Sequence, residues 1–222
     1  MSYILNIHTA TETAITSLAE NGRVLQHFSN TSSREHAGFL HVAMQQLFND
    51  LSLDIRQLDG IAVNCGPGSY TGIRVGMAAA KGLCYALSKP LIFCNTLELL
   101  ARAAIETTRQ AEGLYGPLVD ARRMEVFTAL YDVSGAIVMP PAAVVLDQDA
   151  FGTYLEAGKV YFMGSGSTKF RALDPGDHAI FLDVEISAEV MASCSFERFI
   201  AGKFENVGYA SPLYVKEFNS KR

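Results

Sequence analysis

A glycine-rich run at positions 66–72 is the clearest candidate for chemistry in this sequence. It reads Gly-Pro-Gly-Ser-Tyr-Thr-Gly and lies between a predicted buried strand and a predicted long helix. A loop of this kind can direct backbone N–H groups toward an anion at the helix N-terminus. The spacing fits neither the Walker A motif nor GxGxxG, because Thr71 stands where each of them requires a glycine. The run therefore indicates either an anion-binding loop or glycines that only permit a tight turn.

Acidic residues at strand ends are the second candidate. Duplicated ATPases of the actin and sugar-kinase kind carry an aspartate near the first hairpin of each lobe, where it holds Mg²⁺. Asp120 takes this position in the second half of the chain, but the equivalent residue in the first half is His8. Because Mg²⁺ prefers oxygen ligands, an imidazole is a poor substitute. We interpret His8 as a hydrogen-bonded structural histidine and Arg122 as a solvated cation, with an anion contact or a pair with carboxylates as the alternatives for Arg122.

Other catalytic constellations are missing from the sequence. The four cysteines (Cys65, Cys84, Cys94 and Cys194) form no CxxC pair, and neither HExxH nor GxSxG occurs. Neither a metal site nor an intrinsic cofactor is expected. Two enzyme readings stay open as alternatives: an actin-like kinase that uses Asp120 and the glycine run, and a metallopeptidase, which would need stoichiometric bound metal.

Composition limits the class of protein further. The chain has 222 residues, of which 49% are apolar and 18% charged, so a folded chain of one large or two small domains is expected. The net charge is −5 and no basic run occurs, which argues against strong nucleic-acid binding by this chain alone. Neither a signal-peptide pattern nor an apolar segment long enough for a bilayer is found, so we expect a cytoplasmic protein without membrane contact.

The elements that must position these residues follow from periodicity. Asn21-Gly22 is a strong hairpin signal between two strands. Strand and helix then alternate, which indicates an α/β fold with a mixed sheet. The predicted strands cover residues 3–7, 13–19, 23–28, 58–63 and 91–94, and the predicted helices cover 34–50, 71–87 and 96–107.

The second half of the chain resembles the first. Residues 5–8 correspond to 117–120, and a strand that ends in Gly-x-Gly-Ser occurs at Gly66 and again at Gly164. We predict a duplicated fold of two lobes, with the N-terminal lobe at 1–108 and the C-terminal lobe at 109–222.

Three segments closely resemble the TsaB family, formerly called YeaZ. They are the run from Gly66 to Leu83, the run from Asp120 to Phe127, and Pro212 to Lys216 near the end of the chain. The opening at residues 7–12 departs from the family pattern, which has aspartate in the place of His8. The resemblance covers nearly the whole chain in order.

The resemblance implies an actin-like (ASKHA) two-lobe fold and a function in tRNA modification. TsaB proteins are non-catalytic relatives of the TsaD transferase, which they support in forming N6-threonylcarbamoyladenosine next to the tRNA anticodon. The implied partners are a TsaD-like transferase and a TsaE-like ATPase. The breadth of apolar residues on the helices at 34–50 and 71–87 leads us to expect a homodimer when the chain is alone. Contact with tRNA is expected only through the complex, and ATP or ADP is expected only in the assembled complex.

The resemblance also places the partner face on the helices at 34–50 and 71–87. Charged substitution at Met44 or Met77 is expected to weaken pairing and leave the fold intact. The candidate interface residues are Phe39, Leu40, Ala43, Met44, Leu47, Ile73, Arg74, Met77 and Ala80. The candidate nucleotide or anion site consists of Gly66, Gly68, Ser69, Gly72, Asp120 and Arg122.

Overall fold

The computed structural model describes residues 1–31, 36–109 and 112–215, which form two compact units. The first unit contains Met1–Thr96 and Ser187–Leu213, and the second contains Leu97–Ile186 with residues 214–215. This division differs from the predicted lobes at 1–108 and 109–222, because a C-terminal segment returns to the first unit. That segment begins with α6 (Ala188–Ile200), which packs against β1, β2, β3 and β5 of the first sheet.

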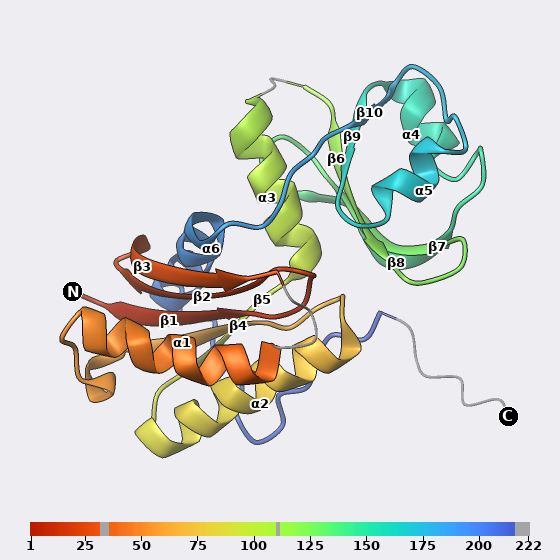
Figure 1. The fold of residues 1–222 in the computed structure, drawn as a ribbon. Coiled ribbons are helices and arrows are strands. Elements are labelled where there is room, and N and C mark those ends of the chain that lie inside the picture. Colours follow the sequence, from red (N-terminus) through yellow and green to blue (C-terminus); the bar gives the residue numbers. More distant parts are fainter. Residues whose placement is uncertain (32–35, 110–111, 216–222) are drawn as a thin grey trace, which may run out of the picture. The chain divides into compact units, whose positions relative to one another are not determined.

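The sheet of the first unit has the strand order β3-β2-β1-β4-β5 (Figure 1). Strand β2 pairs antiparallel with β1 and β3, whereas β1, β4 and β5 run parallel. The turn between β2 and β3 uses Asn21 and Gly22, both at positive φ, as the hairpin signal predicts. The strands are β1 (Tyr3–His8), β2 (Ala14–Glu20), β3 (Arg23–Asn30), β4 (Gly60–Asn64) and β5 (Leu91–Cys94).

Helices cover both faces of this sheet. Figure 1 shows α1 (His36–Asp50) and α2 (Tyr70–Leu87) side by side on one face, with α6 on the other. A short 3-10 helix, η1 (Ile55–Gln57), precedes β4. The first two residues of the predicted helix at 34–50 lie outside the described residues. The core lies between the sheet and these helices, where Leu40 and Leu47 of α1 are completely buried with Ile61 of β4.

The second unit repeats the topology of the first. Its sheet has the order β10-β9-β6-β7-β8, with antiparallel pairs β6–β7 and β7–β8 and parallel pairs β6–β9 and β9–β10. The predicted duplication is therefore confirmed. The strands are β6 (Leu114–Asp120), β7 (Glu125–Tyr131), β8 (Ile137–Val145), β9 (Val160–Met163) and β10 (Ala179–Phe181), and the helices are α3 (Thr96–Thr108, counted with the second unit from Leu97), α4 (Gly152–Ala157) and α5 (Ser167–Arg171).

An aromatic cluster forms the core of the second unit. The rings of Phe151, Phe162 and Phe170 lie with their centroids 5.0–5.2 Å apart, in tilted and edge-on arrangements that aromatic pairs favour. The helix that follows the fourth strand differs in length between the units, since α5, which follows β9, has 5 residues and α2, which follows β4, has 18.

The C-terminal segment of the first unit runs along the edge of the sheet after α6. Glu205 forms an antiparallel bridge with Leu91 of β5, and Val207 and Ala210 pack against the core. Lys81 of α2 donates a hydrogen bond from Nζ to the carbonyl of Ala210 at 2.9 Å. Within the described part of the chain, no helix combines the length and the apolar character needed to cross a membrane.

Candidate functional site

The glycine run lies between β4 and α2, where its backbone N–H groups bond within the first unit. The N–H of Gly66 donates to Oδ1 of Asn64 at 2.8 Å, and the N–H of Ser69 donates to the carbonyl of Ala10 at 2.8 Å. The N–H of Gly72 donates to Oγ of Ser69, which thereby caps α2 at 3.2 Å. These three donors, which an anion-binding loop would present to its ligand, are used by the chain itself.

The glycines are required by close packing against the β1–β2 loop. A Cβ atom at Gly68 would overlap the carbonyl oxygen of Ala10, and one at Gly72 would overlap that of Thr9. The hydroxyl of Thr9 also donates to the carbonyl of Gly72 at 2.7 Å. Of the two readings left open by the sequence, this geometry favours structural glycines, and the anion site stays a prediction.

His8 ends strand β1 and is 1% exposed. Its Nδ1 lies 2.8 Å from Nδ2 of Asn64, and its Nε2 lies 2.7 Å from Oγ1 of Thr11. Oδ1 of Asn64 accepts hydrogen bonds from Gly66 and from the hydroxyl of Thr96, so the amide group of Asn64 turns its NH₂ toward the ring. These contacts assign the proton to Nε2, because Nδ1 must accept. His8 is thus a buried, hydrogen-bonded side chain, as its departure from aspartate suggests.

Asp120 ends strand β6 in the second unit and is bound by a lysine of the same chain. Nζ of Lys169 on α5 lies 2.6 Å from Oδ1 of Asp120 and donates to the carbonyl of Arg123, also at 2.6 Å. The N–H of Arg122 donates to the same Oδ1 at 2.6 Å, and Oγ of Ser165 accepts from the N–H of Asp120.

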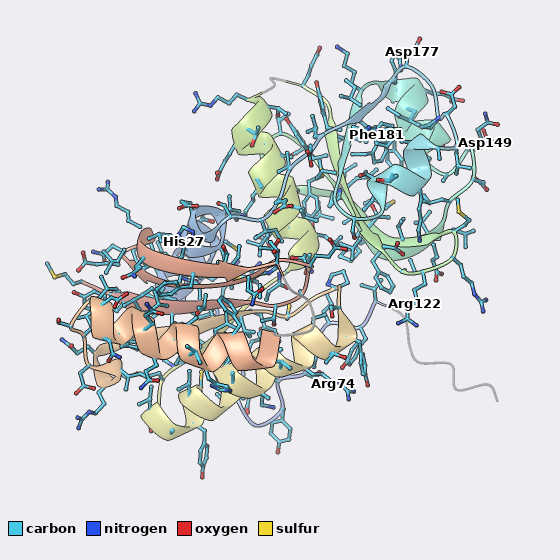
Figure 2. The ribbon with its side chains drawn as sticks, viewed as in Figure 1. His27, Arg74, Arg122, Asp149, Asp177 and Phe181 are labelled. Atoms are coloured by element: carbon cyan, nitrogen blue, oxygen red, sulfur yellow. The ribbon has the colours of Figure 1, made fainter. Side chains whose placement is uncertain are left out.

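The electrostatics of Asp120 follow from these contacts. Burial acts to raise the pKa of its carboxyl, but the hydrogen bonds from Lys169 and from the backbone of Arg122 outweigh burial and lower the pKa below its ordinary value. Arg122 is exposed on the β6–β7 turn (Figure 2) and, like Arg123, has a positive φ. Asp120 is therefore an ionised carboxylate whose counter-ion is the ammonium of Lys169.

The magnesium of actin-like ATPases does not fit the residues present at the two strand ends. In the first unit, the ring of His8 replaces the carboxylate and both of its nitrogens have protein partners. In the second unit, the ammonium of Lys169 lies against the oxygen that a cation would need. Across residues 1–31, 36–109 and 112–215, three or more His, Cys, Asp or Glu side chains do not come together in a group able to hold a metal.

Sequence reasoning missed Asn64 and Lys169. Asn64 lies two residues before the glycine run, and Lys169 lies two residues after the Gly-Ser-Gly-Ser of the second unit. Their position after the last strand residue or in the next helix is a signal that could have drawn attention. Their partners, however, are 56 and 49 residues away in sequence, so the contacts appear only in the fold.

The predicted interface residues need correction, because most are buried within the first unit. Among the nine predicted interface residues, Arg74 alone is exposed, and Phe39 is half-buried. The expectation that a charge at Met44 or Met77 would spare the fold is therefore wrong, since these side chains are 6% and 4% exposed. The sequence shows only that these positions are apolar, and the fold places them against the sheet. The buried residues are Leu40, Ala43, Met44, Leu47, Ile73, Met77 and Ala80.

The outward surface of α1 and α2, which we call the helical face, consists of residues other than most of the predicted ones. Arg74 lies in the first part of α2 and is labelled in Figure 2. Its guanidinium stacks 4.0 Å from the centroid of the ring of Tyr70 at the start of that helix. Val42 is 65% exposed and Tyr85 is 85% exposed. The helical face consists of Gly38, His41, Val42 and Gln45 on α1 and of Tyr70, Arg74, Ala78, Gly82 and Tyr85 on α2.

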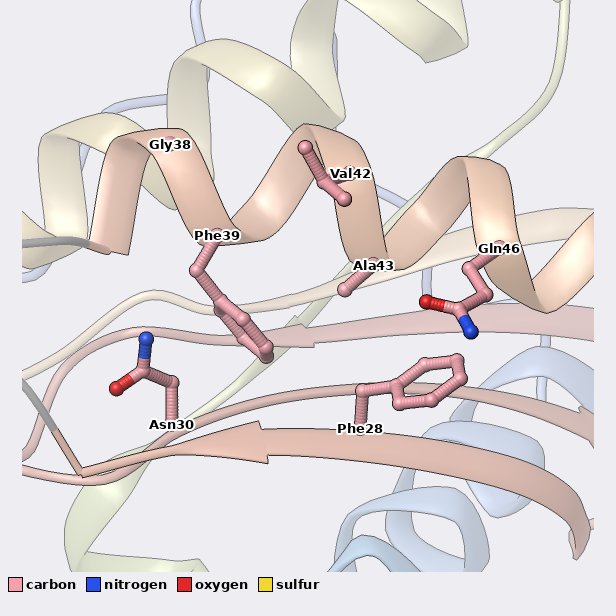
Figure 3. Close-up of a pocket in the computed structure, with 7 residues that line it drawn as sticks. All are labelled: Phe28, Asn30, Gly38, Phe39, Val42, Ala43 and Gln46. Carbon is pink, nitrogen blue, oxygen red and sulfur yellow. The ribbon is translucent and has the colours of Figure 1, made fainter.

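A groove of about 410 Å³ lies between α1 and the edge strand β3 (Figure 3). Phe28 of β3 and Phe39 of α1 line it with aromatic rings, and Val42 belongs both to this lining and to the helical face. The lining residues are Phe28, Asn30, Gly38, Phe39, Val42, Ala43 and Gln46.

Two mixed sheets of one topology, each flanked by helices, define the chain as a protein of the actin-like fold class, as predicted. The family model described as TsaD, tRNA N6-adenosine threonylcarbamoyltransferase, matches residues 24–194. Together with the relatives below, this match shows that the chain belongs to the TsaB (YeaZ) family within the wider TsaD-like group.

Relatives in three bacteria are similar to this chain. A tRNA threonylcarbamoyladenosine biosynthesis protein TsaB of Escherichia coli is 28% identical over 96% of this chain and 94% of its own length. The protein of the same description in Bacillus subtilis is 34% identical over 64% of this chain, and the match spans 62% of that relative. The solved structure of YeaZ from Pseudomonas aeruginosa is 25% identical, with a TM-score of 0.81 over 96% of this chain and all of that chain.

Proposed function

We propose that this chain is a non-catalytic subunit that binds a TsaD-type transferase and supports the formation of N6-threonylcarbamoyladenosine in tRNA. The relatives in E. coli and B. subtilis, which are described as tRNA threonylcarbamoyladenosine biosynthesis proteins, support the pathway. One observation supports the non-catalytic role: the residues at both strand ends, His8 and Asp120, have their polar atoms engaged by the chain itself.

Catalysis in an actin-like ATPase requires a carboxylate able to hold a cation and a loop with N–H groups available for phosphate. Here the N–H groups of Gly66, Ser69 and Gly72 bond to protein oxygens. The carboxylate of Asp120 is ion-paired with Lys169. The chain therefore contributes binding rather than chemistry, and ATP or ADP is used in the assembled complex.

The helical face is the surface that we assign to the transferase. Ala78 and Gly82 follow Arg74 at four-residue spacing along α2 and are exposed, so a partner helix can approach closely. A Cβ atom at Gly82 would have no neighbour within 4 Å in this chain. Arg74 supplies a charged anchor, and Val42 and Tyr85 supply apolar contacts at the two sides.

The remaining partners follow from this assignment. A second copy of the chain would use the same helical face when no transferase is present, so the homodimer and the heterodimer exclude each other. A TsaE-like ATPase joins the pair, and tRNA is contacted through the complex, because the chain has a net charge of −5.

Light scattering behind a sizing column tests the partner assignment. The chain is mixed with the transferase of the same organism, and a one-to-one complex is expected to replace any self-associated form. Val42→Glu should raise the dissociation constant by about tenfold or more, because pairing would bury an unpaired carboxylate.

Ile200→Glu is the matched control for this experiment. Ile200 is 68% exposed, close to the 65% of Val42, but lies on α6 at the opposite face of the sheet. Equal affinity of wild type and Val42→Glu would refute the helical face as the partner surface. Two unshifted peaks for the wild-type pair, with and without Mg-ATP, would contradict the proposed function as a whole.

A further inference from the structure

Lys169 contacts two oxygen atoms at the end of β6 that together resemble a site for a hard cation. One is Oδ1 of the Asp120 carboxylate and the other is the carbonyl oxygen of Arg123, each 2.6 Å from the ammonium. Carboxylate and backbone carbonyl oxygens are the donors that Mg²⁺ and Mn²⁺ take in proteins. We infer that the Lys169 ammonium acts as a tethered cation, which occupies the position of a divalent ion at Asp120 and organises the turn that follows.

The turn between β6 and β7 depends on this arrangement. Arg122 and Arg123 both have positive φ, 69° and 48°, a conformation that costs free energy for residues other than glycine. Oδ1 of Asp120 accepts the N–H of Arg122, while Lys169 holds the carbonyl of Arg123. The carboxylate and the ammonium thus satisfy one donor and one acceptor of the same turn, and two arginine side chains are presented to solvent.

The burial of the pair favours a persistent contact over a loose surface ion pair. The side chain of Lys169 is 23% exposed and that of Asp120 is 39% exposed. Lys169 lies on α5, and the adjacent Phe170 belongs to the aromatic core of the second unit, which fixes the helix that carries the ammonium. The bond from Asp120 N–H to Ser165 fixes the strand end from the other side.

This inference goes beyond the proposed function, which uses the same ion pair only as a sign that the Asp120 carboxylate is engaged. Partner binding is assigned to the helical face of the first unit and is measured separately. Its test uses Mn²⁺ as the probe and the broadening of amide NMR signals by the paramagnetic ion as the readout. The full chain is compared with Lys169→Met, which keeps an unbranched side chain, shorter by one atom, and removes the charge. Lys159→Met, at an exposed lysine of the same unit, is the control for loss of one positive charge.

Wild type and Lys159→Met should show no selective broadening of the signals of residues 120–124. In Lys169→Met, these signals should broaden selectively at a Mn²⁺ concentration about tenfold or more below any that affects them in wild type. The reason is that removal of a positive charge at contact distance changes cation affinity by at least that factor. The added substitution Asp120→Asn should abolish the gain. Lys169→Arg keeps the charge and should exclude Mn²⁺ as wild type does.

Two results would overturn the inference. One is selective broadening at residues 120–124 in wild type at the same Mn²⁺ concentration as in Lys169→Met. The other is a folded Lys169→Met protein that gains no broadening and keeps the wild-type amide shifts of the turn. If Lys169→Met does not fold, Lys169→Arg decides: selective broadening in that variant refutes a charge-based exclusion. Partner binding, measured separately, distinguishes these outcomes from failure of the proposed function.

Discussion

The two units share one sheet topology but differ at equivalent positions, the ends of β1 and β6. In the first unit the strand ends in a buried His8, which accepts a hydrogen bond from Asn64 at Nδ1 and donates one to Thr11 from Nε2. In the second unit it ends in an ionised Asp120 paired with Lys169. The equivalent position thus has a different interaction in each unit. In the first unit it is a buried imidazole with hydrogen bonds at both nitrogens, and in the second it is an ion pair. Neither leaves a carboxylate available for magnesium.

The glycine loops of the two units also differ, in the atoms against which their glycines pack. After β4, Gly68 and Gly72 pack directly on backbone oxygens of the β1–β2 loop. After β9, Gly166 donates its N–H to the carbonyl of Leu118, and a Cβ there would lie 2.6 Å from a methyl carbon of Val126. The atoms nearest to a Cβ at Gly68 or Gly72 belong to the backbone, which cannot move easily. At Gly166 the nearest atom belongs to a side chain, which can move, and the carbonyl oxygen of Leu118 is farther away, at 3.2 Å.

Gly72→Ala is expected to have the largest effect on stability. The new Cβ would overlap the carbonyl oxygen of Thr9, so the free energy of unfolding should fall by about 3 kcal/mol, at the upper end of overpacking effects. Gly166→Ala should cost less, about 1 to 2 kcal/mol, because Val126 can shift. Urea unfolding followed by circular dichroism measures both.

Gly82→Ala is the control for this pair of variants. It lies on the same helix as Gly72, its Cβ would meet nothing, and alanine favours a helix by about 1 kcal/mol over glycine, so stability should rise. If Gly166→Ala cost more than Gly72→Ala, the difference between the two loops would be refuted.

Asn64→Ala tests the hydrogen bonds of the first unit. It removes the donor to Nδ1 of His8 and the acceptor for Gly66 and Thr96, all of which are buried. Loss of about 2 to 3 kcal/mol is expected, because unsatisfied buried polar groups cost about 1–3 kcal/mol each and some will find new partners.

The control for Asn64→Ala is Asn49→Ala, at an exposed asparagine of α1. Both variants are measured by thermal unfolding. A change in Asn64→Ala no larger than in the control would show that the His8 contacts do not stabilise the unit.

Lys81→Met tests the attachment of the C-terminal segment to the first unit. The hydrogen bond from Nζ to the carbonyl of Ala210 would be lost, with an expected cost of about 1 kcal/mol. Limited proteolysis should cut this variant faster than wild type between residues 203 and 213. Lys89→Met is the control, because Lys89 is also half-buried and follows α2; it should leave the cleavage rate unchanged.

The smallest expected effect is the pH dependence due to Asp120. Its pKa is lowered in the folded chain, so the pair with Lys169 adds stability above the pKa of the unfolded chain and loses it as pH falls through the folded value. The effect should stay below about 1 kcal/mol, since both groups are partly exposed. Wild type should therefore lose more of its melting temperature than Asp120→Asn between neutral pH and about pH 3.

Asp149→Asn, at an exposed aspartate of the same unit, is the control for this comparison. An identical pH dependence in wild type and Asp120→Asn would show that the ion pair does not contribute to folding.

Local pattern and the family resemblance together predicted much of the fold. The hairpin at Asn21-Gly22, the glycine run before a long helix and the repeat that relates residue 8 to residue 120 are all encoded in neighbouring residues or in a fixed offset. The return of α6 to the first unit could not be predicted, because an amphipathic helix does not reveal which sheet its apolar side will cover.

The same limit applies to the candidate site. Met44 and Met77 have the side chains that either a core or an interface requires, and only the fold shows that they are buried. The contacts of Asn64 and Lys169 join distant segments, so no local pattern encodes them. Val42, which is exposed, is absent from the predicted interface, because the candidates on this helix follow the three- and four-residue spacing of its apolar positions and Val42 lies outside that set.

The most direct test of the central claim is the rate of N6-threonylcarbamoyladenosine formation on tRNA by the reconstituted complex of this chain with its transferase. If the chain binds and does not catalyse, a complex with Asp120→Asn should work at the wild-type rate, whereas one with Val42→Glu should lose most of its activity at limiting subunit concentration. A loss with Asp120→Asn as large as that from omitting the chain, with complex formation intact, would contradict the account.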